Sequence, residues 1–269
     1  MKSMDYAKHV LVRPGSTLRL KYRDPDDTLG MKRDDKALEK TLNRLNELQH
    51  LLYADKRYAL LIVLQGLDAS GKDGTIRHVM SGVNPQGCEV TSFKAPSMDE
   101  LAHDYLWRIH QAVPRLGNIG IFNRSHYEDV LIVRVHRLAE KSVWSKRFHQ
   151  INEFERMLSE NGVTILKFFL HISREEQKKR FLSRIEDSSR NWKLSLPDFE
   201  ERQHWNDYVQ AYEDVLHRCN TPWAPWYVIP ANKKWFRNHL VANLTVAALD
   251  QMKLKYPAPT VDISKVVLE

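Results

Sequence analysis

The chain has 269 residues, of which 42% are hydrophobic and 28% charged, with a formal net charge of +7. This composition indicates a globular protein that can bury a core without disulfides, and Cys88 and Cys219 match no metal-binding spacing. The N-terminus has no apolar signal core and no apolar run is long enough to span a bilayer, so we expect a cytoplasmic protein without a membrane partner. The positive charge predicts a polyanionic partner, and nucleic acid, nucleotides and inorganic phosphate chains all satisfy that electrostatic requirement.

The N-terminal part is predicted to begin with an irregular extension over residues 1–35, because loop-forming residues gather at 23–27. A helix is expected to follow, because leucines recur there at helical spacing. These leucines are Leu38, Leu42, Leu45, Leu48 and Leu52. Their shared face either covers a sheet or forms a contact between subunits.

The rest of the chain alternates short apolar strands with longer helical patterns, which is typical of a parallel α/β sheet. The strands are expected at residues 58–64, 88–93, 118–123, 164–172 and 226–230. The helices are expected at residues 75–81, 98–112, 127–136, 141–160 and 234–254. No repeat or linker interrupts the pattern, so we expect a single domain over residues 1–269, with five parallel strands sandwiched by helices.

The first predicted strand runs into residues 66–75, which fit the first seven positions of the phosphate-loop pattern G-x-x-x-x-G-K-[ST]. In such a loop, backbone N–H groups converge on phosphate oxygens and the following helix adds positive potential. The residues expected to hold phosphate are Gly66, Ala69, Ser70, Gly71, Lys72, Asp73, Gly74 and Thr75. Asp73 stands where the pattern has a Mg²⁺-binding hydroxyl, which argues against an ordinary ATPase or GTPase. It is either a metal ligand or a first-turn acid that the helix dipole favours.

A second chemical cluster, residues 123–129, follows the third predicted strand. In phosphate-loop kinases the end of this strand offers an acid to Mg²⁺. Here that position is Asn123, a neutral ligand, and a nearby carboxylate such as Glu128 could restore the lost charge. Arg124 is expected to direct its guanidinium at phosphate oxygens. His126 is interpreted as structural, because transfer to an anionic phosphate acceptor needs no base.

The long polar interval between the fourth and fifth strands, residues 174–217, is expected to form a helical lid. Ser173 followed by Glu176 is a capping box, which predicts the start of a helix. Arg180 and Arg184 are four residues apart and share one face of that helix. Lids close over phosphates and their arginines neutralise charge, although the same arginines can also be interpreted as a solvated face.

Taken together, these residues resemble the polyphosphate kinase 2 family from about residue 35 to the C-terminus. The matching motifs are Gly66-x-Asp68-x-x-Gly71-Lys72-Asp73-Gly74-Thr75, Asn123-Arg124-Ser125-His126-Tyr127, Ser173-x-Glu175-Glu176-Gln177-x-x-Arg180-Phe181-x-x-Arg184, Trp192-Lys193 and residues 224–234. A phosphate loop alone would be weak evidence, whereas this ordered set is specific.

The resemblance implies an α/β P-loop kinase fold and reversible, in-line phosphoryl transfer between inorganic polyphosphate and a nucleotide, without a covalent intermediate. It implies Mg²⁺, with Mn²⁺ as the alternative ion, and no nucleic-acid partner. Many relatives have Asp at the position of Asn123, and the variant here resembles the class III subgroup, which accepts both AMP and ADP. Adenine nucleotides are therefore the expected acceptors, with guanine nucleotides as a second class. The likeness also suggests a homodimer or homotetramer.

The same resemblance assigns roles to individual residues. Asp68 and Glu128 would hold the metal, with Asn123 assisting. The phosphates would be held in line by Lys72, Arg124, Arg180 and Arg184, with Arg134 and Lys233 as further phosphate or nucleotide contacts. Two alternatives stay open: an ATP-dependent nucleoside monophosphate kinase, which shares the fold and lid, and a non-catalytic polyanion-binding protein.

Overall fold

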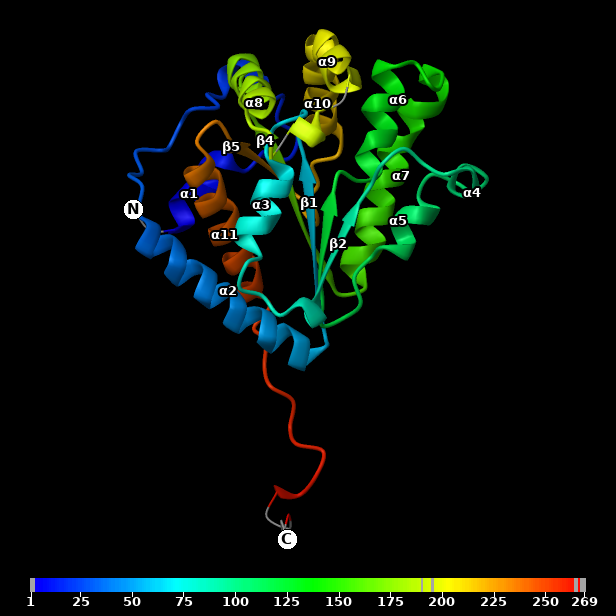
Figure 1. The fold of residues 1–269 in the computed structure, drawn as a ribbon. Coiled ribbons are helices and arrows are strands. Elements are labelled where there is room, and N and C mark those ends of the chain that lie inside the picture. The colour runs from blue at the N-terminus through cyan, green and yellow to red at the C-terminus, as the bar shows by residue number, and fades with distance from the viewer. Residues whose placement is uncertain (1–2, 190, 195, 264–265, 267–269) are drawn as a thin grey trace.

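The fold is built around one parallel sheet. A computed structural model describes residues 3–189, 191–194, 196–263 and 266 (Figure 1). The five strands are β1 (Ala59–Gln65), β2 (Cys88–Ser92), β3 (Ile119–Asn123), β4 (Val163–His171) and β5 (Trp226–Pro230). They pair in the order β2-β3-β1-β4-β5, and all pairs are parallel. The predicted five-stranded parallel sheet is therefore confirmed, with every strand boundary within one residue of its expected place.

Helices connect and cover these strands. The described α-helices are α1 (Ser3–Val10), α2 (Asp35–Asp55), α3 (Lys72–Val79), α4 (Met98–Leu101), α5 (Trp107–Gln111), α6 (Ile132–Val135), α7 (Lys141–Glu160), α8 (Arg174–Glu186), α9 (Leu196–Glu201), α10 (Trp205–Arg218) and α11 (Lys234–Gln251). Short 3₁₀ turns are η1 (Leu20–Tyr22), η2 (Pro85–Gly87), η3 (His126–Val130), η4 (Asn191–Lys193) and η5 (Arg202–His204). Among the residues that the structure describes, no helix is long and apolar enough to cross a membrane.

The central strand β1 separates two hydrophobic cores. All seven of its residues are buried, as expected for a strand covered on both faces. Leu60 and Ile62 pack into the core beneath α2, α3 and α11, whereas Leu61 and Val63 pack into the core beneath α5, α7 and α10. Figure 1 shows these two layers on opposite sides of the sheet. The alternation places the carboxyl end of β1, and the loop that follows it, between two rigid layers.

Two predicted helices are shorter and more broken than expected. The helix expected at 98–112 is split into α4 and α5, because the Asp104 carboxylate accepts the backbone N–H of Leu106 at 2.9 Å and so favours a turn. The helix expected at 127–136 begins as η3 and continues as α6 only after Leu131, which has the non-helical angles φ −104° and ψ −84°. By contrast, α7 has its predicted bounds.

The prediction of an irregular N-terminal extension was wrong in part, since the described residues of this segment are packed onto the body. It contains α1 and η1, and Val12 N–H donates to Trp226 O at 2.9 Å, which ties the segment to β5. Four of its apolar side chains are buried: Val10, Val12, Leu18 and Leu20. These residues do not form a regular pattern in sequence, so only their tertiary contacts reveal that the segment belongs to the core.

The leucine face of α2 covers the sheet layer, as the first of the two interpretations proposed. Leu45, Leu48 and Leu52 are buried in the core that α2 shares with α11. The helix begins where the Asp34 carboxylate accepts Ala37 N–H at 3.0 Å and ends at Lys56, which has left-handed angles.

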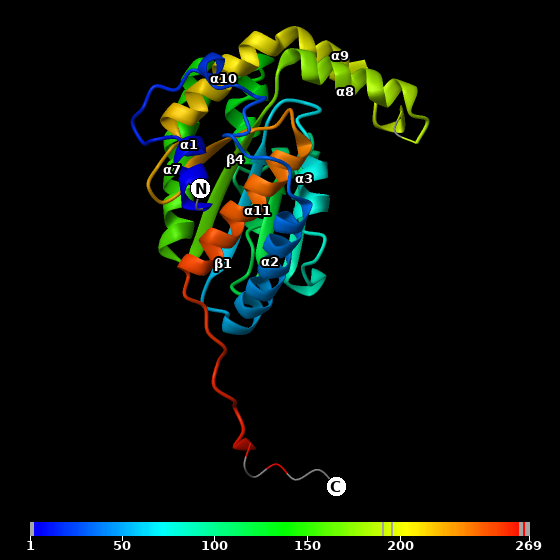
Figure 2. The same ribbon diagram turned by 90° about the vertical axis from the view of Figure 1, so that its left-hand side faces the viewer.

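The insertion between β4 and β5 is helical, as predicted, and Figure 2 shows α8 and α9 projecting beyond the body of the sheet. Ser173 Oγ accepts Glu176 N–H at 3.0 Å and so caps α8. The Glu176 carboxylate does not complete the expected capping box, because it accepts a hydrogen bond from Arg180 Nε at 2.7 Å. Residues 190 and 195 of the predicted lid lie outside the described part of the chain.

Candidate active site

The candidate site lies at the carboxyl edge of the sheet, where the loops after β1 and β3 meet. The two strands are neighbours, with Leu64 paired to Asn123, and Arg124 N–H donates to Leu64 O at 3.1 Å. Helix α8 begins at the end of β4, on the other side of β1, and passes above the same edge (Figure 1). Ligand sites of open α/β sheets lie at this edge, outside the carboxyl ends of the strands.

The loop after β1 has the backbone that a phosphate cradle needs. Gly66, Ala69 and Gly71 all have positive φ, at +148°, +59° and +102°. A Cβ at Gly66 would lie 2.8 Å from the Leu170 carbonyl oxygen, so only glycine fits there. From Gly71 the chain turns directly into α3, three residues before the predicted helix start, so the first N–H groups of the helix point to the loop. The geometry is that of an anion-binding turn.

Lys72 is the buried cation of this loop. Its Nζ donates to the backbone oxygens of Gly66 at 2.7 Å and Leu67 at 3.3 Å, so the side chain folds back over the loop. Burial lowers the pKa of Lys72 to about 8, and the charge of Arg124 adds to this effect. A phosphate in the cradle would favour the protonated form and replace the carbonyl contacts.

The loop after β3 contributes an arginine and two acids. Arg124 Nη2 donates to Asp68 Oδ1 at 2.8 Å, which joins the two loops. Arg124 itself has φ +62°, a conformation that a non-glycine residue holds only when its surroundings fix it. Burial raises the pKa of Glu128, against the opposing charges of Arg124 and Lys72. Burial likewise raises the pKa of Asp129 to about 6, although Arg147 donates to its carboxylate at 3.0 Å.

The donor set between the loops suits a hard cation that keeps other oxygen ligands. Asp68 and Glu128 provide carboxylates, and the amide nitrogen of Asn123 donates to Asp73 at 2.7 Å, which leaves the amide oxygen for a cation. Among the described residues no group of three or more His, Cys, Asp or Glu could hold a metal by itself. Mg²⁺ commonly binds through one or two carboxylates plus substrate phosphates, so these residues fit it.

Comparisons with known proteins agree with this geometry. Residues 28–257 match the family model described as "Polyphosphate kinase 2 (PPK2)". The chain belongs to the polyphosphate kinase 2 family. It is 50% identical over 266 residues to the AMP/ADP-polyphosphate phosphotransferase of Meiothermus ruber, which covers 97% of this chain and 100% of the relative. It is 48% identical to the ADP-polyphosphate phosphotransferase of Rhodopseudomonas palustris, over 83% of this chain and 81% of the relative.

A solved structure gives the same result for the fold. The crystal structure of polyphosphate kinase 2 from Arthrobacter aurescens TC1 superposes with a TM-score of 0.90 at 42% identity, covering 94% of this chain and 92% of that one. The predicted family and P-loop kinase fold are thus confirmed, and the chain is an enzyme, a polyphosphate kinase. Enzymes that transfer phosphoryl groups in this way generally need a divalent metal ion.

In this polyphosphate kinase, Arg180 lies behind the phosphate loop. Its Nη1 donates to the carbonyl oxygens of Ala69 at 2.8 Å and Ser70 at 2.9 Å. Its Nη2 donates to the carbonyl oxygens of Ala231 at 2.6 Å and Asn232 at 3.0 Å. A side chain that the sequence suggested as a phosphate contact is therefore, in this structure, a brace between the phosphate loop and the loop after β5.

Three other predicted residues lie apart from the two loops. Arg134 pairs with Asp214 of α10 and stacks over Trp144, with its Cζ 5.0 Å from the ring centre. The Arg184 guanidinium is 5.5 Å from the ring centre of Phe181. Lys233 Nζ donates to the Asp26 carbonyl oxygen at 2.9 Å, in the N-terminal segment. Their roles as phosphate or nucleotide contacts stay predictions.

Residues that sequence reasoning missed tie the insertion to both loops. Tyr212 of α10 accepts the N–H of Gly66 at 3.2 Å and donates to Gln65 Oε1 at 3.1 Å. Gln65 Nε2 in turn donates to Ser125 Oγ at 3.0 Å, in the loop after β3. The sequence showed Tyr212 only as one of several aromatic residues, and nothing in its spacing distinguished it from packing residues.

His126 belongs to a buried polar cluster and is not part of the open site. Its Nε2 lies 3.2 Å from Glu155 Oε1, which also accepts the Tyr127 hydroxyl at 2.7 Å. Lys167 Nζ donates to Glu155 Oε2 at 2.6 Å and to the Cys219 carbonyl oxygen at 2.7 Å. This arrangement agrees with the structural interpretation of His126, and it fixes the start of the loop that carries Glu128.

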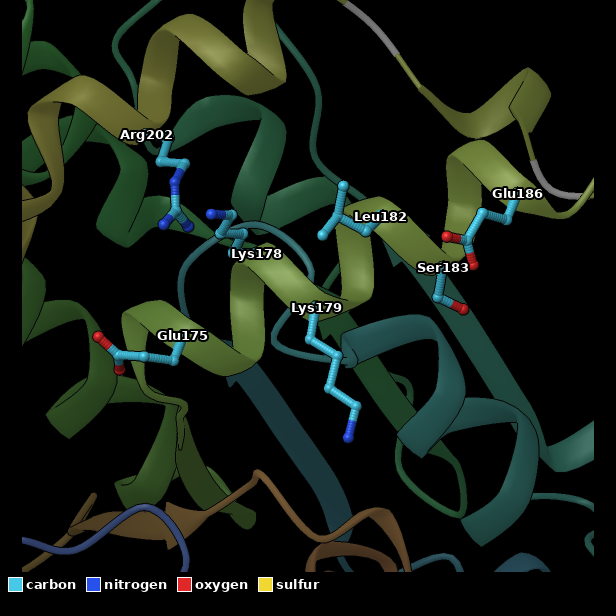
Figure 3. Close-up of a pocket in the computed structure, with 7 residues that line it drawn as sticks. All are labelled: Glu175, Lys178, Lys179, Leu182, Ser183, Glu186 and Arg202. Carbon is cyan, nitrogen blue, oxygen red and sulfur yellow. The ribbon is translucent and has the colours of Figure 1, made fainter.

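The outer face of α8 carries a separate open cavity of about 640 Å³ (Figure 3). Arg202 reaches down onto α8, where its Nη1 donates to Arg174 O and Gln177 Oε1, both at 2.9 Å. Figure 3 shows Lys178 directed towards Arg202 while Lys179 points away from it, so basic side chains lie on two sides of the helix. These contacts hold the two arms of the insertion together.

Proposed function

We propose that this polyphosphate kinase moves phosphoryl groups from inorganic polyphosphate to AMP and ADP, giving ADP and ATP. The observation that carries the proposal is the meeting of Asp68 and Lys72 on one loop with Arg124 and Glu128 on the other. The Meiothermus ruber relative, which matches over nearly the whole of both chains, carries a name that states the same two acceptors. Adenine nucleotides are the main acceptors in this proposal, and guanine nucleotides are a second class.

In the proposed reaction, the chain's own residues bind and orient phosphate. Backbone N–H groups of the loop and of the first turn of α3 surround the transferred phosphoryl group. Lys72 leaves its carbonyl contacts to reach it, and Arg124 spans the oxygens of donor and acceptor. The acceptor oxygen is already anionic, so no residue needs to remove a proton and no covalent intermediate forms. The remaining barrier is lowered by holding two anions in line.

Asp68, Glu128 and Asn123 are the residues that would hold Mg²⁺, or Mn²⁺ in its place. When bound, the ion would supply positive charge that neutralises the phosphates. Glu128 must be ionised to bind the ion. Burial disfavours the ionised carboxylate, which is why the pKa of Glu128 is raised.

The insertion over residues 174–217 acts as the lid of a single domain in this proposal. Its helix α10 already bonds the phosphate loop through Tyr212, so a movement of the insertion is transmitted to the cradle. Arg184 then approaches the phosphates on closure, while Arg134, which lies outside the lid and pairs with Asp214 of α10, is a second proposed phosphate contact. A homodimer or homotetramer in the cytoplasm completes the proposal.

The test is an acceptor panel with purified protein, long-chain polyphosphate and Mg²⁺. AMP, ADP, GMP and GDP are offered separately, and products are resolved by chromatography. ATP formed from both AMP and ADP supports the proposal. ATP from ADP alone would contradict the two-acceptor assignment, and a reaction that needs ATP as the donor would favour a nucleoside monophosphate kinase instead. Omission of Mg²⁺, with Mn²⁺ restored in a parallel sample, tests the ion.

A further inference from the structure

A second arginine, Arg237, lies beneath the phosphate loop and is only 1% exposed. It is in the first turn of α11, and its Nε and Nη2 donate to Asn238 Oδ1 at 3.1 and 2.8 Å. Its Nη1 donates to the Ser70 carbonyl oxygen at 3.4 Å. The guanidinium therefore reaches the loop from behind, and it bonds only neutral oxygens in these contacts.

Arg237 shares the Ser70 carbonyl with Arg180, whose Nη1 donates to it at 2.9 Å. Arg180 has a counter-ion, since its Nε donates to Glu176 at 2.7 Å. Arg237 forms no salt bridge with any carboxylate in the described part of the chain. Burial, together with the charge of Arg180, lowers the pKa of Arg237 to about 9. Two guanidinium groups and one carboxylate thus leave an excess positive charge behind the loop.

The glycines of the loop motif make room for this guanidinium. A Cβ added at Gly71 would lie 1.9 Å from Arg237 Nη1 and 2.9 Å from its Cζ. A Cβ at Gly74 would lie 3.4 Å from Nη2. Arg237 therefore packs directly against the loop backbone. In the proposed site, one layer of peptide backbone separates the guanidinium from the phosphate.

A buried charge without a counter-ion is costly, and an apolar side chain of the same length would fill this space at lower cost. The cost is offset when an anion binds across the loop, because charges in the protein interior attract with little screening by water or salt. The same guanidinium cannot touch that anion, since the loop backbone lies between them.

We propose that Arg237 is a positioning residue, a fixed cation behind the phosphate loop that strengthens phosphate binding without contacting the phosphate. It also holds the Ser70 peptide in the orientation that the cradle requires. This inference rests on the proposed function only in requiring that the loop holds phosphate.

The test is the affinity for inorganic tripolyphosphate, measured by calorimetry without nucleotide for the wild type and Arg237→Met. We expect the dissociation constant of Arg237→Met to rise on the order of tenfold, because the charge is lost while the volume is kept. Leu240→Ala is the matched control, since Leu240 is equally buried on the same helix. That control should melt at a lower temperature and bind tripolyphosphate within twofold of the wild type.

Arg237→Lys gives a second readout that a purely structural role would not move. A buried lysine loses its proton at a lower pH than arginine. We therefore expect Arg237→Lys to bind tripolyphosphate nearly as tightly as the wild type at pH 6.5 and several-fold more weakly than the wild type at pH 8.5. This comparison also decides the matter if Arg237→Met fails to fold.

Two results would overturn the inference: an Arg237→Met dissociation constant within twofold of the wild type, or a ratio between Arg237→Lys and the wild type that does not change with pH. The failure of the proposed function would be seen differently. In that case the acceptor panel would yield no ADP or ATP from polyphosphate, whatever the affinities of the wild type and the variants for tripolyphosphate.

Discussion

The Asn123 amide nitrogen donates a hydrogen bond to Asp73 Oδ1 over 2.7 Å. These residues stand at the two positions where the chain departs from common kinase patterns, since Asp73 replaces a hydroxyl and Asn123 replaces an acid. The departures are therefore coupled. An amide can donate to a carboxylate, whereas two carboxylates at this distance would repel each other unless they share a proton or a cation.

Asn123→Asp should make the protein more dependent on divalent ions. Without an ion, the new carboxylate faces Asp73 and the melting temperature is expected to fall by a few degrees, as for the loss of about 1 kcal/mol. Added Mg²⁺ should raise the melting temperature more than it does in the wild type, because the ion relieves the repulsion. Thermal melts with and without Mg²⁺ measure both effects.

Activity gives an independent measurement of the same substitution. We expect Asn123→Asp to change the ratio of the AMP and ADP rates, because the charge beside the acceptor phosphates changes. Asn123→Ala is the control, since it removes the hydrogen bond without adding charge. An Asn123→Asp protein with the wild-type rate ratio and the wild-type response to Mg²⁺ would contradict this coupling.

Lys72 is expected to make phosphate binding depend on pH. Its pKa of about 8 in the free protein means that the cation is present at pH 7 and largely lost at pH 9. The affinity for tripolyphosphate should therefore fall between pH 7 and 9, by up to tenfold per pH unit. Calorimetric titrations at pH 7, 8 and 9 measure this slope.

An arginine has a higher ordinary pKa than a lysine and would keep its proton at position 72 over more of this range, so Lys72→Arg should show a flatter slope whatever its absolute affinity. The same shift affects folding with a definite sign. The unfolded chain binds more protons than the folded one between the folded pKa of about 8 and the ordinary value of 10.5, so Lys72 makes stability rise with pH across that window. Equal slopes of affinity against pH in the wild type and Lys72→Arg would show that another group controls the pH dependence of binding.

We expect substitutions of Arg180 and Arg184 to have different effects: loss of Arg180 should mainly lower stability, and loss of Arg184 should mainly lower activity. Arg180 bonds four backbone carbonyls, so Arg180→Ala is expected to lower the free energy of unfolding by about 3 kcal/mol and to reduce activity as a consequence. Arg184 is only partly buried and stacks on Phe181, so Arg184→Ala should cost less than about 1 kcal/mol.

Urea unfolding and steady-state kinetics on the two variants give the comparison. In the lid proposal, Arg184→Ala lowers kcat at least tenfold while the unfolding curve stays close to that of the wild type. Wild-type kinetics for Arg184→Ala would return this arginine to the solvated face of the helix.

Much of the fold could be predicted because the strands of the sheet have local sequence patterns that identify them. The buried run of β1 and the glycines that follow it identify a strand, a loop and a helix without any tertiary information. The break between α4 and α5 could not be predicted. The turn at Asp104 and a continuous helix differ in free energy by only about one hydrogen bond, which sequence patterns do not resolve.

The site could be predicted only where a residue belongs to a motif. Lys72, Asp68 and Arg124 were predicted because the loops that carry them are recognisable in sequence, and the structure places these side chains close together. Arg180 was predicted as a phosphate contact, but its partners in the structure are carbonyl oxygens on two distant loops, which no spacing can indicate. Arg237 was missed for the same reason, because a single arginine in a helix has the pattern of a surface residue.

The buried ion pair between Glu155 and Lys167 should contribute strongly to stability and to activity, although neither residue belongs to the two loops of the candidate site. Burial alone would raise the pKa of Glu155, but Lys167 and His126 lower it below its ordinary value, so the carboxylate is charged inside the core. Glu155→Gln leaves Lys167 buried without a counter-ion and should cost about 3–5 kcal/mol of unfolding free energy.

A matched control lies on the same helix. Glu153 pairs with Arg156 at the surface, so Glu153→Gln should cost less than about 1 kcal/mol. Because Glu155 also accepts the hydroxyl of Tyr127, directly before Glu128, we expect Glu155→Gln to reduce kcat as well as stability. Replacing both partners, as Glu155→Leu with Lys167→Met, removes the unpaired charge and should recover part of the stability but not kcat, since Leu and Met cannot bond the buried Tyr127 hydroxyl. Equal unfolding energies for Glu155→Gln and Glu153→Gln would contradict the buried ion pair.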